Sequence, residues 1–353
     1  MDENSVPDGY TIQRILNIFA SSATRNTIIG AEKAGIIPVA GRRDAGSVRV
    51  RAWNADDVPK IGARYGFLKP FSRPLVLTVF TTKGGSLKTT LALNIARLAA
   101  LHDIRTCVVG LDIQGDITTA MGYEVEVDDT ESIEAALDRL NSTKGLGDVY
   151  EGRAKLEETV LTTDLPTLSL LPETPELAAL DDALSGVGEL RREYWLTENV
   201  VNPLKQRFDL IVLDCSPNWN MLVTNALVAS DVLVSPLECK INNFRNLKVF
   251  RGFVERFRRK LHLDFAHIFV PTRLTSTRKL STAIRAWYMQ NLPNCTNTSI
   301  RENSQGEESI SAHLSVPEYA PKSLFADEMR ELLTEVWAQA HTKAAAVSAK
   351  TAA

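Results

Sequence analysis

The sequence lacks most of the features that mark secreted, membrane-spanning or metal-clustering proteins. It has four cysteines, with no Cys-x-x-Cys pair and no histidine at metal-ligand spacing, so we expect buried thiols in a reducing compartment. No apolar run approaches the roughly 20 residues that cross a bilayer, and the first residues lack the basic and apolar regions of a signal peptide. The formal net charge is only −3. These absences favour a cytoplasmic protein with no membrane contact, in which DNA binding depends on local basic patches.

From residue 75 to about residue 338, strand-like and helix-like segments alternate. Continuous apolar runs between amphipathic helices are typical of a parallel sheet that is covered on both faces. The sequence therefore predicts an α/β fold with a doubly wound, mostly parallel sheet in a domain over residues 75–341. Predicted strands are 75–81, 105–112, 168–173, 208–216 and 266–274, and predicted helices are 89–102, 175–187 and the first part of 221–233.

The first 70 residues predict a smaller unit. Two helical segments, one near 10–20 and one capped by Ser22 or Thr24, precede a turn, a strand near 48–52 and a short helix that Asn54 can cap. This order is that of a winged helix-turn-helix and is similar to the MerR-type winged helix. The alternative is a helical dimerisation arm with a solvated basic loop. Residues 71–74 are expected to form a linker, and residues 342–353 a disordered tail or a frayed helix end.

The predicted unit carries two groups of candidate DNA contacts. Arginines of the wing could neutralise phosphates, and polar residues at the start of the second helix could face base edges. The wing residues are Arg42, Arg43, Arg49 and Arg51, and the helix residues are Thr24, Arg25 and Asn26.

The stretch FTTKGGSLKTT, residues 80–90, joins the first predicted strand of the larger domain to a helix. A strand, a glycine-rich loop and a helix N-terminus in this order predict a phosphate site, because loop N–H groups and the helix dipole attract anionic oxygens. Lys88 is expected to reach the β- and γ-phosphates of a nucleotide, and the Thr89 hydroxyl to coordinate Mg²⁺. The predicted binding residues are Lys83, Gly84, Gly85, Ser86, Leu87, Lys88, Thr89 and Thr90.

Two carboxylates follow predicted strands and are expected beside this loop, because ligands of open parallel sheets lie beyond the carboxyl ends of the strands. Asp112 ends one strand, and its alternative role is that of a helix cap. Asp214 follows four apolar residues, 210–213, in a Walker B pattern, and would hold Mg²⁺ through water.

These motifs resemble the ParA family of partition ATPases, over about residues 75–338. Residues Lys83, Gly84, Gly85, Lys88, Thr89 and Thr90 match its deviant Walker A sequence, and Asp112, Gln114 and Gly115 match its next motif. The resemblance implies a slow ATPase that forms an ATP-sandwiched dimer, with Lys83 reaching the phosphates of the other subunit. It implies that Asp112 positions the attacking water, and that a ParB-like partner stimulates hydrolysis.

Several residues depart from the family pattern, among them Ile113 for proline and Asp116 for asparagine, and two departures bear most on the site. Leu87 stands where glycine is usual and cannot easily take a positive φ. We therefore expect either an ordinary φ at this residue or a reduced nucleotide affinity. Gly110 stands where the family has the first of two aspartates.

The C-terminal half carries a second group of candidate DNA contacts, whose alternative is a solvated helix face. In ParA relatives, basic residues of this half bind nucleoid DNA without sequence preference, which implies nucleoid association and strong salt dependence. The residues are Arg256, Arg258, Arg259, Arg278 and Lys279. The N-terminal unit adds the expectation of autorepression at an operator. The alternatives are an ATP-switched transcription regulator with weak hydrolysis, or a positioning ATPase for a non-DNA cargo.

Overall fold

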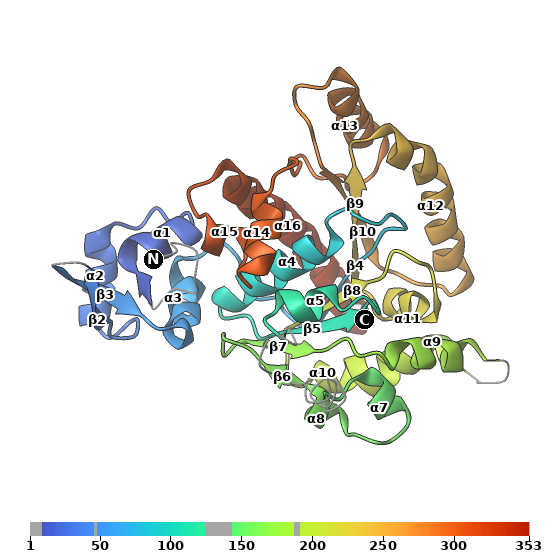
Figure 1. Cartoon of the computed structure of the whole chain (residues 1–353), viewed down its shortest axis with the longest axis horizontal. Helices are drawn as coiled ribbons and strands as arrows, with labels where there is room; N and C mark the ends of the chain where they lie inside the picture. Colours follow the sequence, from blue (N-terminus) through green and yellow to red (C-terminus); the bar gives the residue numbers. More distant parts are fainter. Residues whose placement is uncertain (1–8, 46–47, 124–142, 187–190, 353) are drawn as a thin grey trace, which may run out of the picture.

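The computed structural model describes residues 9–45, 48–123, 143–186 and 191–352 and contains two sheets (Figure 1). The larger sheet has seven strands in the order β10-β9-β4-β8-β5-β7-β6. Neighbouring strands are parallel except for the antiparallel pair of β6 and β7. The predicted doubly wound, mostly parallel sheet is thus confirmed. Its strands are β4 Leu75–Val79, β5 Thr106–Leu111, β6 Leu161–Thr162, β7 Leu168–Leu171, β8 Leu210–Cys215, β9 Val232–Glu238 and β10 Ala266–Thr272.

Helices cover both faces of this sheet, because alternate strand residues point to opposite sides. Leu77 packs into one core cluster with helices α4 and α16, whereas Val76 packs into a second cluster with α9, α11, α12 and α13. The α-helices of this domain are α4 Lys88–Leu101, α5 Asp116–Ala120, α7 Leu146–Tyr150, α8 Leu156–Thr159, α9 Leu177–Ser185, α10 Asn202–Leu204, α11 Met221–Ala229, α12 Ile241–Lys260, α13 Lys279–Asn291, α14 Gln305–Ser311, α15 Val316–Tyr319 and α16 Leu324–Ala352.

The N-terminal unit contains the two helices, the strand near 48–52 and the short helix that the sequence predicted, and in addition the strands β1 and β2, of which β2 lies where a turn was expected. Thr24 caps the second helix by accepting the Thr27 N–H at 3.2 Å, and Asn54 lies at the start of η1 without a side-chain capping bond. The short β1 makes the sheet three-stranded, in the order β1-β3-β2. The elements are β1 Tyr10–Thr11, α1 Ile12–Ile18, α2 Arg25–Lys33, β2 Gly41–Ala45, β3 Val48–Trp53, η1 Ala55–Asp57 and α3 Val58–Tyr65.

This unit is docked on the larger domain and shares a core cluster with it. One contact lies at the C-terminal end of α4, where His102 accepts the Phe67 N–H at 3.0 Å. Others join α1 to α15 and α16, as when Arg14 donates to the Glu318 carbonyl at 2.8 Å and Arg330 to the Asn17 carbonyl at 3.1 Å. In the predicted linker, Phe71 stacks on Trp337 of α16 at 4.8 Å between ring centroids. The segment 71–74 is therefore packed against the domain at this residue.

A substitution at Gly62 of α3 would test this docking. A Cβ at this position would lie 1.9 Å from the Leu101 carbonyl oxygen and 2.7 Å from Cζ of Phe19. We expect Gly62→Ala to lower the free energy of unfolding by about 1–3 kcal/mol, since backbone would have to move. Gly30→Ala in α2 is the matched control, because nothing lies within 4 Å of the added Cβ. It should raise stability by about 0.5–1 kcal/mol. Equal urea midpoints for the two variants would contradict the docking.

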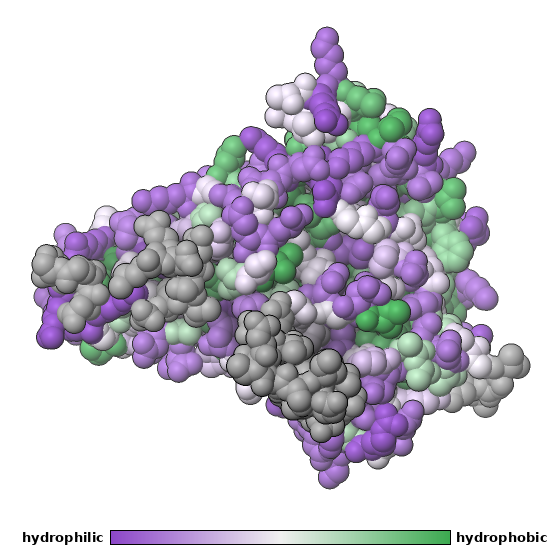
Figure 2. Space-filling model, viewed as in Figure 1, coloured by the Kyte–Doolittle hydropathy of each residue, from purple (hydrophilic) through white to green (hydrophobic). Residues whose placement is uncertain are grey.

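The C-terminal segment differs from the predicted disordered tail. Helix α16 continues to Ala352, consistent with the high helix propensity of the alanines in this segment. Lys343 also forms an ion pair with Asp264 at 3.1 Å, and Ala344 is buried. Within the described residues no helix is long and apolar enough to cross a membrane, and the face in Figure 2 is mostly hydrophilic.

Candidate functional site

The glycine-rich loop lies between β4 and α4, at the carboxyl edge of the large sheet. The Ser86 hydroxyl donates to the Lys83 carbonyl at 3.0 Å, and the Lys88 ammonium donates to the same oxygen at 3.3 Å. Two positive φ values shape the turn, 71° at Gly85 and 72° at Leu87. Lys83 itself is exposed. The loop thus holds Lys88 inward and leaves Lys83 on the surface.

The expectation of an ordinary φ at Leu87 is wrong. Leu87 adopts φ 72° and ψ 29°, the left-handed region, at the N-cap of α4. A side chain in this region costs about 1–2 kcal/mol, and Leu87 packs against the neighbouring core cluster. The fold therefore keeps the conformation that a glycine would take and accommodates the leucine in it.

Comparing two truncations measures this strain. We expect Leu87→Gly to be more stable than Leu87→Ala by about 1 kcal/mol, since both remove the leucine side chain and only alanine retains a Cβ at positive φ. Thermal or urea unfolding of the two variants gives the difference. At an ordinary helical φ the order would reverse, because alanine is then the more stable residue.

Lys88 is buried at the N-terminus of α4, with 8% of its surface exposed. Burial lowers the pKa of its ammonium, and the carboxylates of Asp214 and Asp112 act in the opposite direction. A buried cation at a helix N-terminus is placed to bind an anion. Because acidic groups lie close by, that anion would have to bind together with a cation such as Mg²⁺.

Asp214 is the last residue but one of β8 and lies in register with Val79 of β4 and Gly110 of β5. It is 1% exposed, and among the described residues neither carboxylate oxygen has a hydrogen-bond partner of accepted geometry. Burial raises the pKa of Asp214 to about 7, while the Thr89 hydroxyl and Lys88 oppose this rise. An unpartnered buried carboxylate is costly, so Asp214 fits a cation site. A hydrated Mg²⁺ suits it, because that ion needs only one or two carboxylates besides its waters and phosphate oxygens.

Asp112 follows β5, next to β8 in the sheet. Its carboxylate accepts the Gln114 N–H at 3.2 Å. Burial raises the pKa of Asp112, against the opposing effects of this N–H and of Lys88. The N-cap of α5 is Gly115, so the alternative role of Asp112 as the cap of that helix is not found.

These groups surround a pocket of about 330 Å³. The structure thus brings residues 85–90 of the predicted loop and Asp112 to one cavity, whereas Lys83, Gly84 and the buried Asp214 do not line it. The lining residues are Gly85, Ser86, Leu87, Lys88, Thr89, Thr90, Asp112, Asp116, Thr119, Arg273, Glu307 and Ile310.

Sequence reasoning assigned no site role to two residues that support this pocket. Arg273 lies in the same basic stretch as Arg278 and Lys279 but was not a predicted site residue. It donates to the Gly85 carbonyl at 2.6 Å and pairs with Glu238 at 3.3 Å. Glu173 follows β7 and accepts the Asp112 N–H at 3.2 Å. Burial and the nearby Asp214 raise its pKa to about 8, against the Thr118 and Asp112 N–H groups. The strand-end rule that found Asp112 would also have indicated Glu173.

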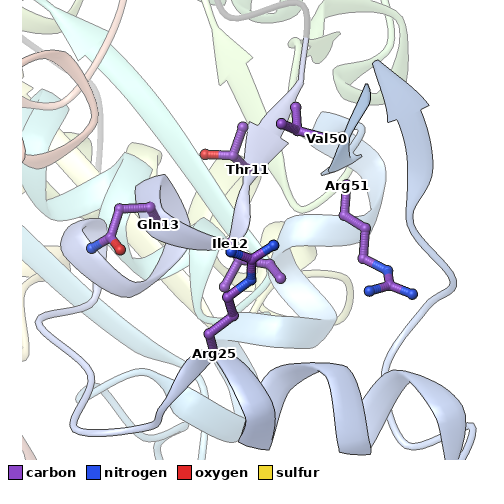
Figure 3. Close-up of a pocket in the computed structure, with 6 residues that line it drawn as sticks. All are labelled: Thr11, Ile12, Gln13, Arg25, Val50 and Arg51. Atoms are coloured by element: carbon purple, nitrogen blue, oxygen red, sulfur yellow. The ribbon is translucent and has the colours of Figure 1, made fainter. Parts of the chain in front are cut away.

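The predicted basic groups lie at opposite ends of the molecule, the first on the N-terminal unit and the second on α12 and α13 (Figure 1). The register of β2 with β3 puts Arg42, Arg49 and Arg51 on one face of the hairpin. Arg25 and Arg51 also line a pocket of about 230 Å³ with Ile12 as a neighbour (Figure 3). Thr24, Arg25 and Asn26 are exposed. Arg51 pairs with the buried Glu32 at 3.1 Å.

On the second group, Arg256, Arg259, Arg278 and Lys279 are exposed. Arg258 differs in being only partly exposed; its guanidinium donates to the Leu263 carbonyl at 3.2 Å and lies over the Phe265 ring. The outer face of α12 is also partly apolar, with Val249 70% and Phe253 43% exposed. This face is therefore not a uniformly charged, solvated surface.

Comparison with known proteins agrees with this geometry. A family model described as an AAA domain matches residues 75–266. The chain is 28% identical over 192 residues to the chromosome partitioning protein ParA of Myxococcus xanthus, a match that covers 54% of this chain and 61% of the relative. The match thus spans less than two thirds of that protein.

Two solved structures show the same fold. A McdA variant from Cyanothece in complex with ATP superposes with a TM-score of 0.62 at 17% identity, over 76% of this chain and 96% of that one. Cobyrinic acid a,c-diamide synthase from Mycobacterium smegmatis, with an ATP analog and magnesium bound, gives 0.55 at 24% identity, over 68% and 91%. In sequence the chain is similar to a ParA protein, and in fold it is similar to McdA and to the synthase. The family match shows that the chain belongs to the AAA domain family.

Proposed function

We propose that the protein is an ATPase that acts in DNA partition and uses ATP and Mg²⁺. The observation that carries this proposal is the unpartnered, buried carboxylate of Asp214 beside Lys88 at the phosphate loop. A McdA variant with ATP and a synthase with an ATP analog and magnesium share the fold. The ParA protein of Myxococcus xanthus, a relative in sequence, is named for chromosome partitioning.

The proposed residue roles follow from burial and position. Lys88 and the loop N–H groups bind the β- and γ-phosphates, while Thr89 and Asp214 hold the magnesium ion, which would neutralise charge on the phosphate oxygens. Asp112 orients a water toward the γ-phosphorus. The water oxygen bonds to phosphorus as the bond to the bridging β–γ oxygen breaks, giving ADP and phosphate, and the water's proton passes to solvent or phosphate. Because phosphoryl transfer depends mainly on positioning and charge stabilisation, a weak base suffices.

A homodimer is part of the proposal because of Lys83. This lysine is exposed at the mouth of the loop, whereas Lys88 is buried in it. One buried and one exposed lysine in the same loop support a division of tasks. Lys88 serves the bound nucleotide, and Lys83 serves the nucleotide of a second subunit. Turnover would then be slow in the free chain and depend on dimerisation.

DNA contacts are proposed for both basic groups. The exposed Arg278 and Lys279 at the start of α13, with Arg256 and Arg259 on α12, are suited to phosphate contacts that carry no sequence information. The N-terminal unit, as a winged helix-turn-helix, would bind an operator through the start of α2 and the β2–β3 hairpin. A ParB-like partner would stimulate hydrolysis, and the protein would associate with the nucleoid.

An ATP-switched transcription regulator is a second candidate function. The docking of the N-terminal unit on α4 favours it, because α4 begins at the phosphate loop and ends under α3. One measurement separates the two candidates. DNA binding is titrated without nucleotide, with ADP and with ATP, on operator-region and random duplexes at two salt concentrations, together with ATP turnover.

For partition we expect ATP to favour random DNA, with strong salt dependence, and DNA with partner to increase turnover. ADP should favour the operator-region duplex. For a regulator, ATP would change only operator binding, and turnover would stay low with every addition. Absence of ATP binding under all conditions would overturn both proposals.

A further inference from the structure

Glu173 makes a set of hydrogen bonds that joins three elements of the site. One carboxylate oxygen accepts the Asp112 N–H at 3.2 Å. The other accepts the N–H groups of Ile117 and Thr118 and the Thr118 hydroxyl, each at 3.2 Å. The Glu173 N–H in turn donates to the Thr118 hydroxyl oxygen at 2.8 Å. A single side chain from the end of β7 therefore holds both the end of β5 and the first turn of α5.

This arrangement depends on Gly110. A Cβ on Gly110 would lie 2.2 Å from Cγ and 2.6 Å from Cδ of Glu173. Real Cβ contacts are never that short, so any side chain at residue 110 and the observed position of Glu173 exclude each other. The Glu173 side chain occupies the space that a side chain at Gly110 would need, so the two residues depend on each other. Gly110 also lies opposite Asp214 in the register of β5 with β8, which puts this pair next to the proposed magnesium ligand.

Glu173 does not line the pocket, whereas Asp112, Asp116 and Thr119 do. These three residues lie in the segment whose backbone Glu173 binds. At 8% exposure, Glu173 is almost closed to solvent, so it does not contact a ligand directly, and its hydrogen bonds act on this segment. A side chain that accepts three N–H groups and a hydroxyl fixes such a turn, because loss of the acceptor would leave buried donors without a partner.

We propose that Glu173 is a positioning residue, which sets the β5–α5 segment so that Asp112 faces the pocket, in the space that Gly110 leaves free. The proposal rests on the proposed ATPase function for its kinetic consequence, but its structural consequence holds without it. Gly110 is then the residue that makes room for a carboxylate supplied by the neighbouring strand.

The test uses the full-length chain and two readouts. The first is amide hydrogen exchange of residues 112–121 without nucleotide, and the second is steady-state ATP turnover. In Glu173→Gln the amide NH₂ replaces one acceptor, so we expect faster exchange at Ile117 or Thr118. We also expect kcat to fall about 10- to 100-fold, as small misplacements of a reacting group can cost this much. KM for ATP should change by less than about twofold, because Lys88 and the loop are untouched.

A double substitution that moves the carboxylate from residue 173 to residue 110 separates the positioning role of Glu173 from its role in packing. Gly110→Asp alone should impair turnover, because its side chain overlaps Glu173. Combined with Glu173→Ala it should recover turnover and protection, since the carboxylate returns from the other strand. Gly110→Leu with Glu173→Ala is the control of similar size without a hydrogen-bond acceptor and should not recover them. If leucine rescues as well as aspartate, only volume matters and the proposal is overturned.

One further variant and the hydrogen-exchange readout make the test conclusive if Glu173→Gln does not fold or if the wild-type chain shows no turnover. Thr118→Val removes one partner of Glu173 with little change in volume and should give a smaller effect in the same direction, should Glu173→Gln fail to fold. If the wild-type chain shows no ATP turnover, the proposed function fails, and exchange at Ile117 and Thr118 still decides the role of Glu173. Wild-type exchange and wild-type kcat in Glu173→Gln would refute it.

Discussion

Replacing Lys88 with alanine is expected to reduce the affinity for ATP by roughly a hundredfold or more. Lys88 is buried at the first turn of α4, and the groups acting on it are the carboxylates of Asp214 and Asp112. Without the Lys88 ammonium, the triphosphate would be repelled by these carboxylates, and no buried cation would offset the repulsion. Loss of one partner of a buried charged interaction costs about 2–5 kcal/mol, and about 2.7 kcal/mol corresponds to a hundredfold change in Kd. Equilibrium binding of a fluorescent ATP analogue with Mg²⁺ measures the effect.

Lys83→Ala is the matched control, because it removes the same side chain from the same loop. Lys83 is exposed and, unlike Lys88, is not enclosed by the loop. The variant should bind ATP with an affinity close to that of the wild-type chain and should lose hydrolysis. Normal hydrolysis by Lys83→Ala would contradict the proposed role across a dimer. Equal loss of binding in both variants would contradict the distinct roles of the two lysines.

The largest expected loss of stability comes from Arg97 in the middle of α4. Its guanidinium is 1% exposed and binds Glu318 at 2.8 Å and 2.9 Å, and Asp164 at 2.9 Å through two further bonds. Burial acts against its charge, but the carboxylates of Glu318 and Asp164 outweigh burial and hold its pKa well above the usual value. We expect Arg97→Met to lower the free energy of unfolding by about 3–5 kcal/mol, because Glu318 would remain buried without its counter-ion.

Arg105→Ala provides the comparison in urea unfolding experiments. Arg105 also binds a carboxylate through two nitrogens, at 2.9 Å and 2.6 Å to Asp209, but its side chain is 58% exposed. Removing this exposed pair should cost less than about 1 kcal/mol. Similar losses for Arg97→Met and Arg105→Ala would mean that burial does not decide the strength of the inner pair.

The parts of the fold that sequence predicted are those with a strong local pattern. The apolar run before Asp214 predicted the strand end, and the glycines after Phe80 predicted the phosphate loop. Both predictions succeeded because strand ends and tight turns are encoded over a few residues. The conformation of Leu87 could not be predicted in this way. Its backbone follows the turn that the loop requires, and tertiary packing overrides the preference of leucine against positive φ.

Contacts between distant segments were also beyond local patterns. Arg273 looked like one cation of a basic run, but the fold turns it toward the Gly85 carbonyl. Glu173 became part of the site because Gly110, 63 positions earlier in the chain, leaves the space for it. For the segment from residue 342, composition left a disordered tail or a frayed helix end open, and α16 continues to Ala352. In each case the partner is set by strand order and helix packing, which no short stretch of sequence encodes.

The docking of the N-terminal unit bears on how an operator would have to be built. If two chains associate as proposed, their α2 helices are carried by rigid bodies, because α3 meets α4 at Gly62 without room for a methyl group. B-form DNA presents the same face every 10–10.5 base pairs, or about one helical turn. A hinged unit could follow half-sites separated by an extra half turn, whereas this docked unit could not. Such a protein would therefore accept only half-site spacings that differ by whole turns of the duplex. The contact between α3 and α4, and not the length of the linker, would determine this limit.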